Sequence, residues 1–76
     1  MRIKEEKTYQ ITVTDLSGNF IGSRVDSYFR NLSDILYAAK TISEREHRYA
    51  KGVRVYCLDD DETEYYKISG ERLIKE

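Results

Sequence analysis

Apolar and polar residues alternate one by one near the start of the chain. Tyr9, Ile11 and Val13 are separated by glutamine and threonine, and this period of two is typical of a strand with one buried face. Residues 17–19, Ser-Gly-Asn, tolerate positive φ angles and therefore predict a turn. An extended pattern resumes after the turn and continues to about Phe29. The first third of the chain thus predicts a β-hairpin.

The middle of the chain changes to the spacing of an amphipathic helix. Asn31 is a good N-cap, and Asp34 follows it by three residues in an arrangement similar to a capping box. The apolar residues that follow fall on one stripe of a helix: Leu32, Ile35, Leu36, Ala39, Ile42 and Tyr49. Gly52 suits the left-handed conformation that ends many helices. We therefore predict a helix that begins after Asn31 and ends at about residues 49–51.

A second alternating pattern follows the helix. Val53, Val55 and Cys57 occupy every second position, which predicts a third strand with these side chains on its buried face. In this setting Cys57 behaves as a small apolar residue.

Turn residues divide the rest of the chain into further strands. An acidic turn at 59–62 leads to a fourth strand at about 64–68, and Ser-Gly-Glu at 69–71 turns the chain into a short strand over 72–75. Hairpins on both sides of one helix favour an antiparallel sheet with the helix on one face. We therefore predict a two-layer α+β domain of four to five strands in the order ββαββ(β).

The length of 76 residues and the charged fraction of 36% limit what the chain can do. A domain of this size buries only about 60% of the surface of its unfolded chain, which leaves little room for an enclosed active site. We expect one domain over residues 1–76, with fraying at the charged residues 1–6. The formal net charge of −1 does not favour a general binder of nucleic acid or anionic membranes.

Cysteine use and hydropathy bear on the compartment. Cys57 is the only cysteine, so an intramolecular disulfide and a four-cysteine zinc site are both excluded. The N-terminal residues contain no apolar run typical of a signal peptide, and no stretch is long and apolar enough for a membrane span. These observations favour the cytosol, without a membrane partner.

A run of acidic residues is the most conspicuous cluster: Asp59, Asp60, Asp61 and Glu62. A calcium-binding EF-hand loop that began at the first of them would need glycine at its sixth position and glutamate at its twelfth. The chain has Glu64 and Gly70 there instead, which argues against a metal site. Two interpretations remain: a solvated hairpin turn that resists edge aggregation, or an acidic surface that contacts a basic groove of a partner.

Basic residues gather in the helix and in the strand that follows it: Lys40, Arg45, Arg48, Lys51 and Arg54. Such a cluster can bind phosphates, but glutamates lie among these residues, and a solvated, ion-paired helix surface has the same pattern. The interpretations are therefore a solvated surface, a protein-contact patch or, least favoured, direct nucleic-acid binding.

Five of the seven tyrosines cannot all lie in the core of so small a domain: Tyr28, Tyr37, Tyr56, Tyr65 and Tyr66. We expect those on the sheet face away from the helix to be exposed, and we predict that Tyr56 and Tyr66 lie on this face with Arg54. Tyrosine and arginine are common interface anchors, so the face predicts a partner or dimer surface. The alternative is that single exposed tyrosines have no role.

Residues suited to catalysis are few. His47, the only histidine, lies among charged residues that indicate exposure, and Cys57 is in phase with the buried residues of its strand. A Cys–His nucleophilic pair is therefore disfavoured. The sequence also lacks a P-loop, a dinucleotide-binding fingerprint and an HExxH motif. We expect no enzyme, no cofactor and no metal.

Part of the chain resembles a known family. Residues 39–45, Ala-Lys-Thr-Ile-Ser-Glu-Arg, followed by residues 51–55, Lys-Gly-Val-Arg-Val, and an acidic turn, resemble small phage-encoded anti-CRISPR proteins. The nearest comparison is a type I-F family with one helix on a small antiparallel sheet. The resemblance covers the helix and the following hairpin. It implies binding to the backbone subunits of a guide-RNA surveillance complex, with Lys40 and Arg45 as the matching contact positions.

We therefore predict a non-enzymatic inhibitor of phage type that blocks a CRISPR complex sterically, as a monomer or a homodimer. Its partner is a protein complex, without direct binding of nucleic acid. The predicted contact residues are Lys40, Arg45, Arg48, Arg54, Tyr56, Tyr66, Asp59, Asp60, Asp61 and Glu62. Two alternatives stay open: an interaction module or inhibitor of another host complex such as RNA polymerase, and a small-ligand binder at a homodimer interface.

Overall fold

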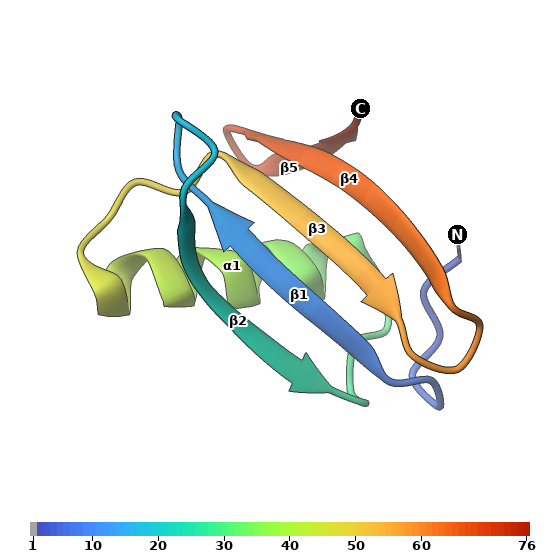
Figure 1. Ribbon diagram of the computed structural model, residues 1–76. Coiled ribbons are helices and arrows are strands. Elements are labelled where there is room, and N and C mark those ends of the chain that lie inside the picture. The colour runs from blue at the N-terminus through green and yellow to red at the C-terminus, as the bar shows by residue number, and fades with distance from the viewer. Residues whose placement is uncertain (1) are drawn as a thin grey trace.

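A computed structural model describes residues 2–76, and over these residues the chain forms five strands and one helix. The elements are β1 (Tyr9–Thr14), β2 (Phe20–Asp26), α1 (Leu32–Glu46), β3 (Gly52–Cys57), β4 (Glu62–Ser69) and β5 (Arg72–Lys75). Figure 1 shows one antiparallel sheet with α1 packed across one of its faces. The predicted two-layer α+β fold is thus confirmed, with the short fifth strand present.

The order of the strands explains where the helix lies. The sheet has the order β2-β1-β3-β4-β5, and each neighbouring pair is antiparallel. Strands β2 and β3 both pair with β1, so they run in the same direction with β1 between them. The connection from β2 to β3 must therefore cross the sheet, and α1 makes this crossing on one face (Figure 1).

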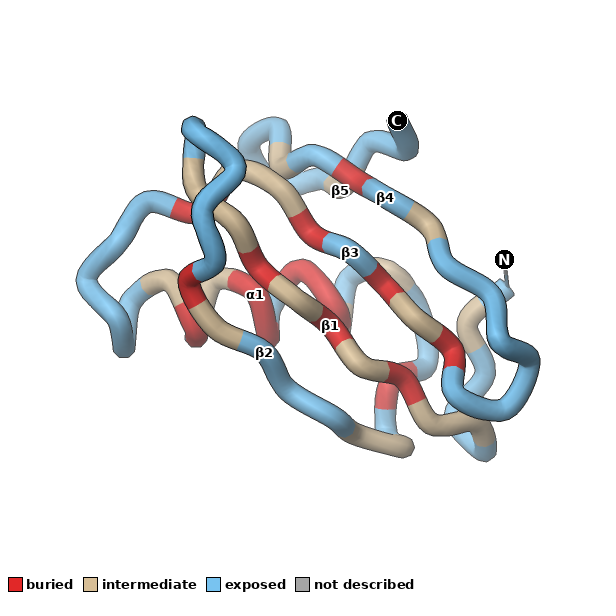
Figure 2. The backbone as a smooth tube through the Cα atoms, in the orientation of Figure 1, coloured by how far each residue is buried: buried red, intermediate tan, exposed pale blue. Residues whose placement is uncertain are grey.

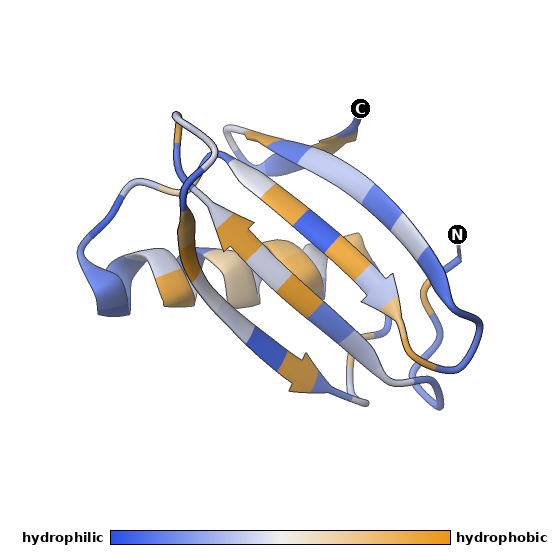
Figure 3. Cartoon of the chain, viewed as in Figure 1, coloured by the Kyte–Doolittle hydropathy of each residue, from blue (hydrophilic) through white to orange (hydrophobic). Residues whose placement is uncertain are grey.

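The core lies between α1 and the central strands. Tyr9, Ile11 and Val13 are fully buried, and Val53 and Val55 of β3 lie beside them. Buried and less buried residues alternate along β1 and β3 in Figure 2, and hydropathy alternates in the same way in Figure 3. This confirms the buried faces predicted from the period of two.

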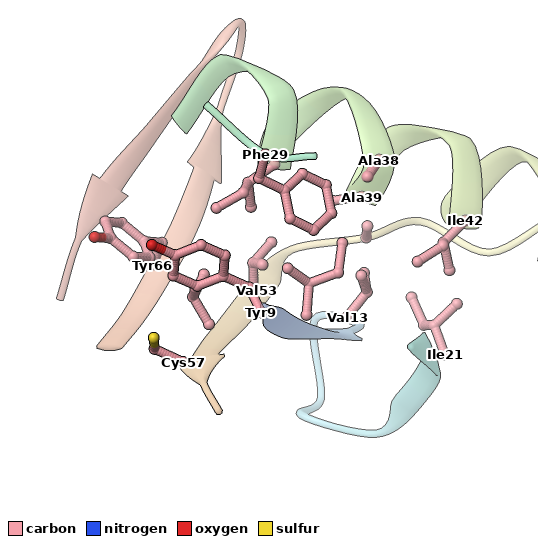
Figure 4. Close-up of a cluster of buried hydrophobic side chains, with 14 residues drawn as sticks. Tyr9, Val13, Ile21, Phe29, Ala38, Ala39, Ile42, Val53, Cys57 and Tyr66 are labelled. Atoms are coloured by element: carbon pink, nitrogen blue, oxygen red, sulfur yellow. The ribbon is translucent and has the colours of Figure 1, made fainter. Parts of the chain in front are cut away.

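The helix packs closely against the sheet where β2 bulges. The register between β1 and β2 shifts at Val13 and Thr14, and Ile21 is buried there. A β-carbon on Gly22 would lie 2.8 Å from Cγ2 of Ile42, closer than atoms pack in protein cores. Glycine at this position therefore lets α1 approach β2, and Figure 4 shows Ile42 and Ile21 facing each other across the layer boundary.

The helix begins as predicted. The Asn31 side chain accepts a hydrogen bond from the backbone N–H of Asp34 at 3.1 Å. The Asp34 carboxylate accepts one from the backbone N–H of Arg30 at 2.8 Å, one residue earlier than a standard capping box requires. In both bonds, a side-chain oxygen accepts a hydrogen bond from a backbone N–H group at the start of the helix.

The predicted end of the helix is wrong by about one turn. Helix α1 ends at Glu46, and His47 takes the left-handed conformation with φ 54°. The hydroxyl of Ser43 donates to the backbone carbonyl of Arg48 and accepts from the backbone N–H of Ala50. These bonds turn the chain back towards the sheet, so Tyr49 leaves the apolar stripe and Gly52 begins β3 instead of capping the helix.

The strand limits also differ slightly from the prediction. Strand β2 ends at Asp26, before Phe29, which is nevertheless buried and makes an edge-on contact with Tyr9, the ring centroids being 6.5 Å apart. Strand β4 begins at Glu62 rather than at residue 64. In the N-terminal segment, where we expected fraying over residues 1–6, Ile3 packs against the core and the backbone N–H of Lys4 donates to the Tyr9 hydroxyl at 2.8 Å. Residue 1 lies outside the described residues.

Candidate binding surfaces

Helix α1 covers one face of the sheet, and no helix or strand of residues 2–76 covers the other (Figure 1). We name this uncovered side the open face. Its side chains follow from the register, because cross-strand partners point to the same side of a sheet. Its large residues are Phe20, Val25, Arg54, Tyr56, Tyr65, Lys67, Arg72 and Ile74.

Tyr66 does not lie on the open face, and that prediction is wrong. Tyr66 pairs with the buried Val53, is 4% exposed, and donates a hydrogen bond to Oε1 of Glu64 at 2.6 Å. Burial, together with the Glu64 carboxylate, raises the pKa of Tyr66 to about 12. Its neighbour Tyr65 pairs with Arg54 and is 56% exposed. The open face therefore holds Tyr65 where we had placed Tyr66.

The signal that distinguishes the two tyrosines was present in the sequence. Ile68 is the one aliphatic residue of the predicted strand over 64–68 and so marks its buried face, and a residue two positions earlier in a strand shares that face. That residue is Tyr66, whereas Tyr65 and Lys67 share the opposite face. Sequence reasoning did not use this spacing and so missed Tyr65 and Lys67. It missed Arg72 because the register of the short β5 sets its face.

The cations of the open face have no ion-pair partner within the described chain. Arg54, Lys67 and Arg72 lie on three adjacent strands, and none of them is within 4.0 Å of a carboxylate in residues 2–76. Nη2 of Arg54 donates only to Oγ1 of Thr12, at 3.3 Å. The glutamates of β4 do not compensate this charge, because Glu62 and Glu64 pair with buried residues of β3 and so lie on the helix side.

Two carboxylates of the described chain lie on or next to the open face. Glu76 follows β5, donates its backbone N–H to the carbonyl of Tyr65 at 2.9 Å, and lines a hollow of about 280 Å³ together with Arg54, Tyr65 and the threonines of β1. Asp61 accepts a hydrogen bond from the Tyr56 hydroxyl at 2.8 Å, which raises the pKa of that tyrosine. This bond fixes the Tyr56 ring at one end of the face.

The predicted basic cluster is divided between different sides of the molecule. Lys40 of α1 pairs with Glu71 at 3.0 Å, and Arg45 pairs with Glu46 at 3.5 Å. Arg48 follows the helix, forms an ion pair with Asp15 and donates to the backbone carbonyl of Phe20 at 2.9 Å. Arg54 points to the open face. The fifth residue, Lys51, lines the same groove as Lys40. The five residues thus do not form one surface, and Arg48 connects the end of the helix region to the β1–β2 turn.

The helix layer carries the most exposed tyrosines. Tyr28, Tyr37 and Tyr49 are 82%, 74% and 73% exposed. Tyr28 and Tyr37 line one shallow hollow, and Tyr49 lines a groove of about 400 Å³ between α1 and the β4–β5 hairpin, together with Lys40 and Glu44. We name this side the helix surface; its residues are Tyr28, Tyr37, Lys40, Glu44, Arg45 and Tyr49.

The acidic run forms a turn whose aspartates each bind another part of the chain. Oδ2 of Asp59 accepts from the backbone N–H of Thr8 at 2.6 Å. Asp60 forms an ion pair with Lys7, and the hydrogen bond from this lysine lowers the pKa of the aspartate. Asp61 holds Tyr56, as described above. The three aspartates therefore have a structural role within the domain, which is to bind the N-terminal segment and β3. Glu62 is the exposed first residue of β4.

The residues considered for catalysis are placed differently from one another. Cys57 is buried on the helix side of β3, and His47 is exposed after the end of α1. Among the described residues, no group of three histidine, cysteine, aspartate or glutamate side chains is arranged to hold a metal ion. Within residues 2–76, the one helix is too short and too polar to cross a membrane.

Comparisons with known proteins add no family to this description. No family model, no curated protein and no solved structure matches the chain.

Proposed function

We propose that this protein is a non-enzymatic inhibitor that acts in the cytosol of a bacterial host cell by occupying a surface of a CRISPR surveillance complex. The observation that carries the proposal is the helix surface, where the exposed Tyr37 and Tyr49 lie near Lys40. The target follows from the resemblance of residues 39–45 and 51–55 to anti-CRISPR proteins.

The composition of the helix surface is that of a protein interface. Tyrosine side chains bury a large area while they keep a polar tip, and tyrosine and arginine are enriched among residues that dominate binding energy. Tyr37, Lys40 and Glu44 follow the i, i+3, i+7 spacing of one helix side, so they connect the two hollows into one continuous contact area. A surface of this kind is suited to bind a folded partner without any chemical step.

The two residues matched by the resemblance differ in how freely they can bind. Lys40 is partly buried, and its pair with Glu71 joins α1 to the β4–β5 turn. Arg45 is 63% exposed in its side chain, and its pair with the neighbouring Glu46 is long at 3.5 Å. Exposed pairs of this type contribute roughly 0–1 kcal/mol. Arg45 can therefore exchange its partner at little cost, and we assign it the main electrostatic contact.

The test is direct binding to a purified type I-F surveillance complex loaded with guide RNA and treated with nuclease, measured by biolayer interferometry. We expect the wild-type protein to bind, and the double variant Tyr37→Ala, Arg45→Glu to lose at least tenfold in affinity. Lys4→Glu, a charge reversal in the exposed N-terminal segment, is the matched control and should bind like the wild type. Circular dichroism establishes that each variant is folded.

Two results would contradict the proposal. Absence of binding by the wild-type protein would remove the CRISPR complex as the target. Equal affinity of the wild type and the double variant would show that the helix surface is not the contact.

A further inference from the structure

We infer that the open face binds single-stranded nucleic acid, with Tyr65 and Tyr56 stacking against bases and Arg54, Lys67 and Arg72 contacting phosphates. This site lies on the side of the sheet opposite to the helix surface, so it goes beyond the proposed inhibitor function. It also reverses the expectation drawn from the net charge.

The aromatic residues are arranged as a stacking platform on adjacent strands. Tyr65 of β4 lies directly across from Arg54 of β3, and Tyr56 lies two residues after Arg54 on the same face. The two tyrosines are therefore diagonal neighbours, at a spacing of roughly 7–8 Å between strand positions. Sheets that bind single-stranded RNA hold successive bases on exposed aromatic residues of neighbouring strands. The bond from Tyr56 to Asp61 fixes one ring before any ligand arrives.

One cation lies directly beside the exposed tyrosine, and two more lie further along the same face. Arg54 is the direct cross-strand partner of Tyr65, and Lys67 is two residues further along β4 on the same face. Arg72 of β5 pairs with Ser69, which lies on that face as well. Because these cations have no carboxylate partner in the described chain, a polyanion can bind them without breaking existing ion pairs. The three cations outnumber the one carboxylate of residues 2–76 beside Tyr65, that of Glu76, so the face can attract a phosphate backbone.

The carboxylates of the chain lie mostly on other sides. Glu62 and Glu64 point to the helix side of β4, and Asp59 and Asp60 bind the N-terminal segment. Asp61 lies at one end of the open face, and Glu76, beside Tyr65, is the one glutamate of the described chain next to the three cations. The formal net charge of −1 therefore conceals a local excess of positive charge. Local charge, not the total, determines how a surface attracts a polyanion.

A single strand fits this face better than a duplex or a protein. A base must be unstacked to lie on a tyrosine ring, and single strands present such bases. The same face of β1 and β4 also carries hydroxyl and amide side chains, which donate and accept hydrogen bonds: Gln10, Thr12, Thr14 and Thr63. Lysine is depleted in protein interfaces, whereas here Lys67 lies two residues from Tyr65 on the same face.

The test uses the isolated protein and fluorescein-labelled 12-mers of thymidine or uridine, with fluorescence anisotropy as the readout. We expect a Kd of about 10⁻⁴ to 10⁻⁶ M near physiological salt. Three phosphate contacts predict that log K falls with log salt with a slope of about −2. Arg54→Gln, Lys67→Gln and Arg72→Gln should each reduce this slope by roughly 0.7.

Substitution of Tyr65 separates stacking from charge. Tyr65→Ala should weaken binding roughly 5- to 150-fold without changing the salt slope, because it removes one base–aromatic stack. Tyr65→Phe keeps the ring and should bind like the wild type. Tyr37→Ala, which removes an even more exposed tyrosine from the helix surface, is the matched control and should also leave binding unchanged.

The inference is overturned if the wild-type protein binds neither oligonucleotide at 50 mM salt, or if Tyr65→Ala and the three charge variants bind as well as the wild type. It is also overturned if the open-face variants change only self-association in light scattering, since the face would then be an interface between two copies. These results do not depend on a surveillance complex, so failure here and failure of the proposed inhibitor function are distinguished.

Discussion

The cations of the helix surface form ion pairs with carboxylates, whereas the cations of the open face do not within the described chain. On the helix surface, Lys40 and Arg45 each lie within 3.5 Å of a carboxylate. On the open face, Arg54, Lys67 and Arg72 have no such partner in residues 2–76. Acidic residues of this part of the chain thus pair with the cations on one side of the sheet and not with those on the other. A nearly balanced sequence can therefore fold into a domain whose two sides differ in how far their cations are paired.

The two sides also differ in what they contribute to stability, and the largest effect is expected in the core. Ile42→Ala removes a buried side chain from the boundary between α1 and β2, and this should cost about 2–5 kcal/mol. Ile74→Ala, on the open face, is the matched control and should change stability by less than about 0.5 kcal/mol. Urea unfolding measures both. Equal losses would contradict the division into a packed side and an open side.

A smaller effect on stability is expected from the two adjacent tyrosines of β4. Tyr66→Phe removes the hydroxyl that donates to Glu64, a hydrogen bond to a charged group, and should cost about 1.5–3 kcal/mol. Tyr65→Phe removes an exposed hydroxyl and should have no measurable effect on thermal unfolding. If Tyr65→Phe were the more destabilising change, the assigned register of β4 would be wrong.

The weakest expected effect is a dependence of stability on pH from Glu64. The hydrogen bond from Lys75, followed by that from Tyr66, lowers the pKa of Glu64 from 4.5 to about 2. A lowered pKa in the folded state stabilises the fold above pH 4.5, and this contribution is lost as the pH falls towards about 2. Glu64→Gln should therefore unfold at a lower temperature than the wild type at pH 6, and the difference should shrink at pH 2–3. A difference that is independent of pH would rule out this carboxylate as the cause.

The sequence predicted the element types well where the signal was local. The alternation of Tyr9, Ile11 and Val13 and the N-cap at Asn31 are properties of neighbouring residues, and the structure confirms both. The helix end was missed because it depends on Ser43, whose hydroxyl binds backbone that has already left the helix. Nothing in the apolar stripe indicates this bond.

The candidate sites were predicted less well than the fold. Arg54 and Tyr56 were correctly expected on the open face, but Tyr66 was exchanged with Tyr65, and Lys67 and Arg72 were not considered. The acidic run was recognised as a turn, although the sequence did not show that Asp59 and Asp60 bind residues near the N-terminus. Such partners are distant in the chain, so no local pattern reveals them.

The sequence by itself determined the order of helix and strands and the buried faces of β1 and β3, because periodicity, caps and turn residues act over a few neighbouring positions. Only the tertiary structure decided which cations are neutralised. The pair between Lys40 and Glu71 and the isolation of Arg54 from carboxylates depend on which strands lie side by side and in which register. Electrostatic pairing requires contact in space, and the sheet order β2-β1-β3-β4-β5 creates that contact.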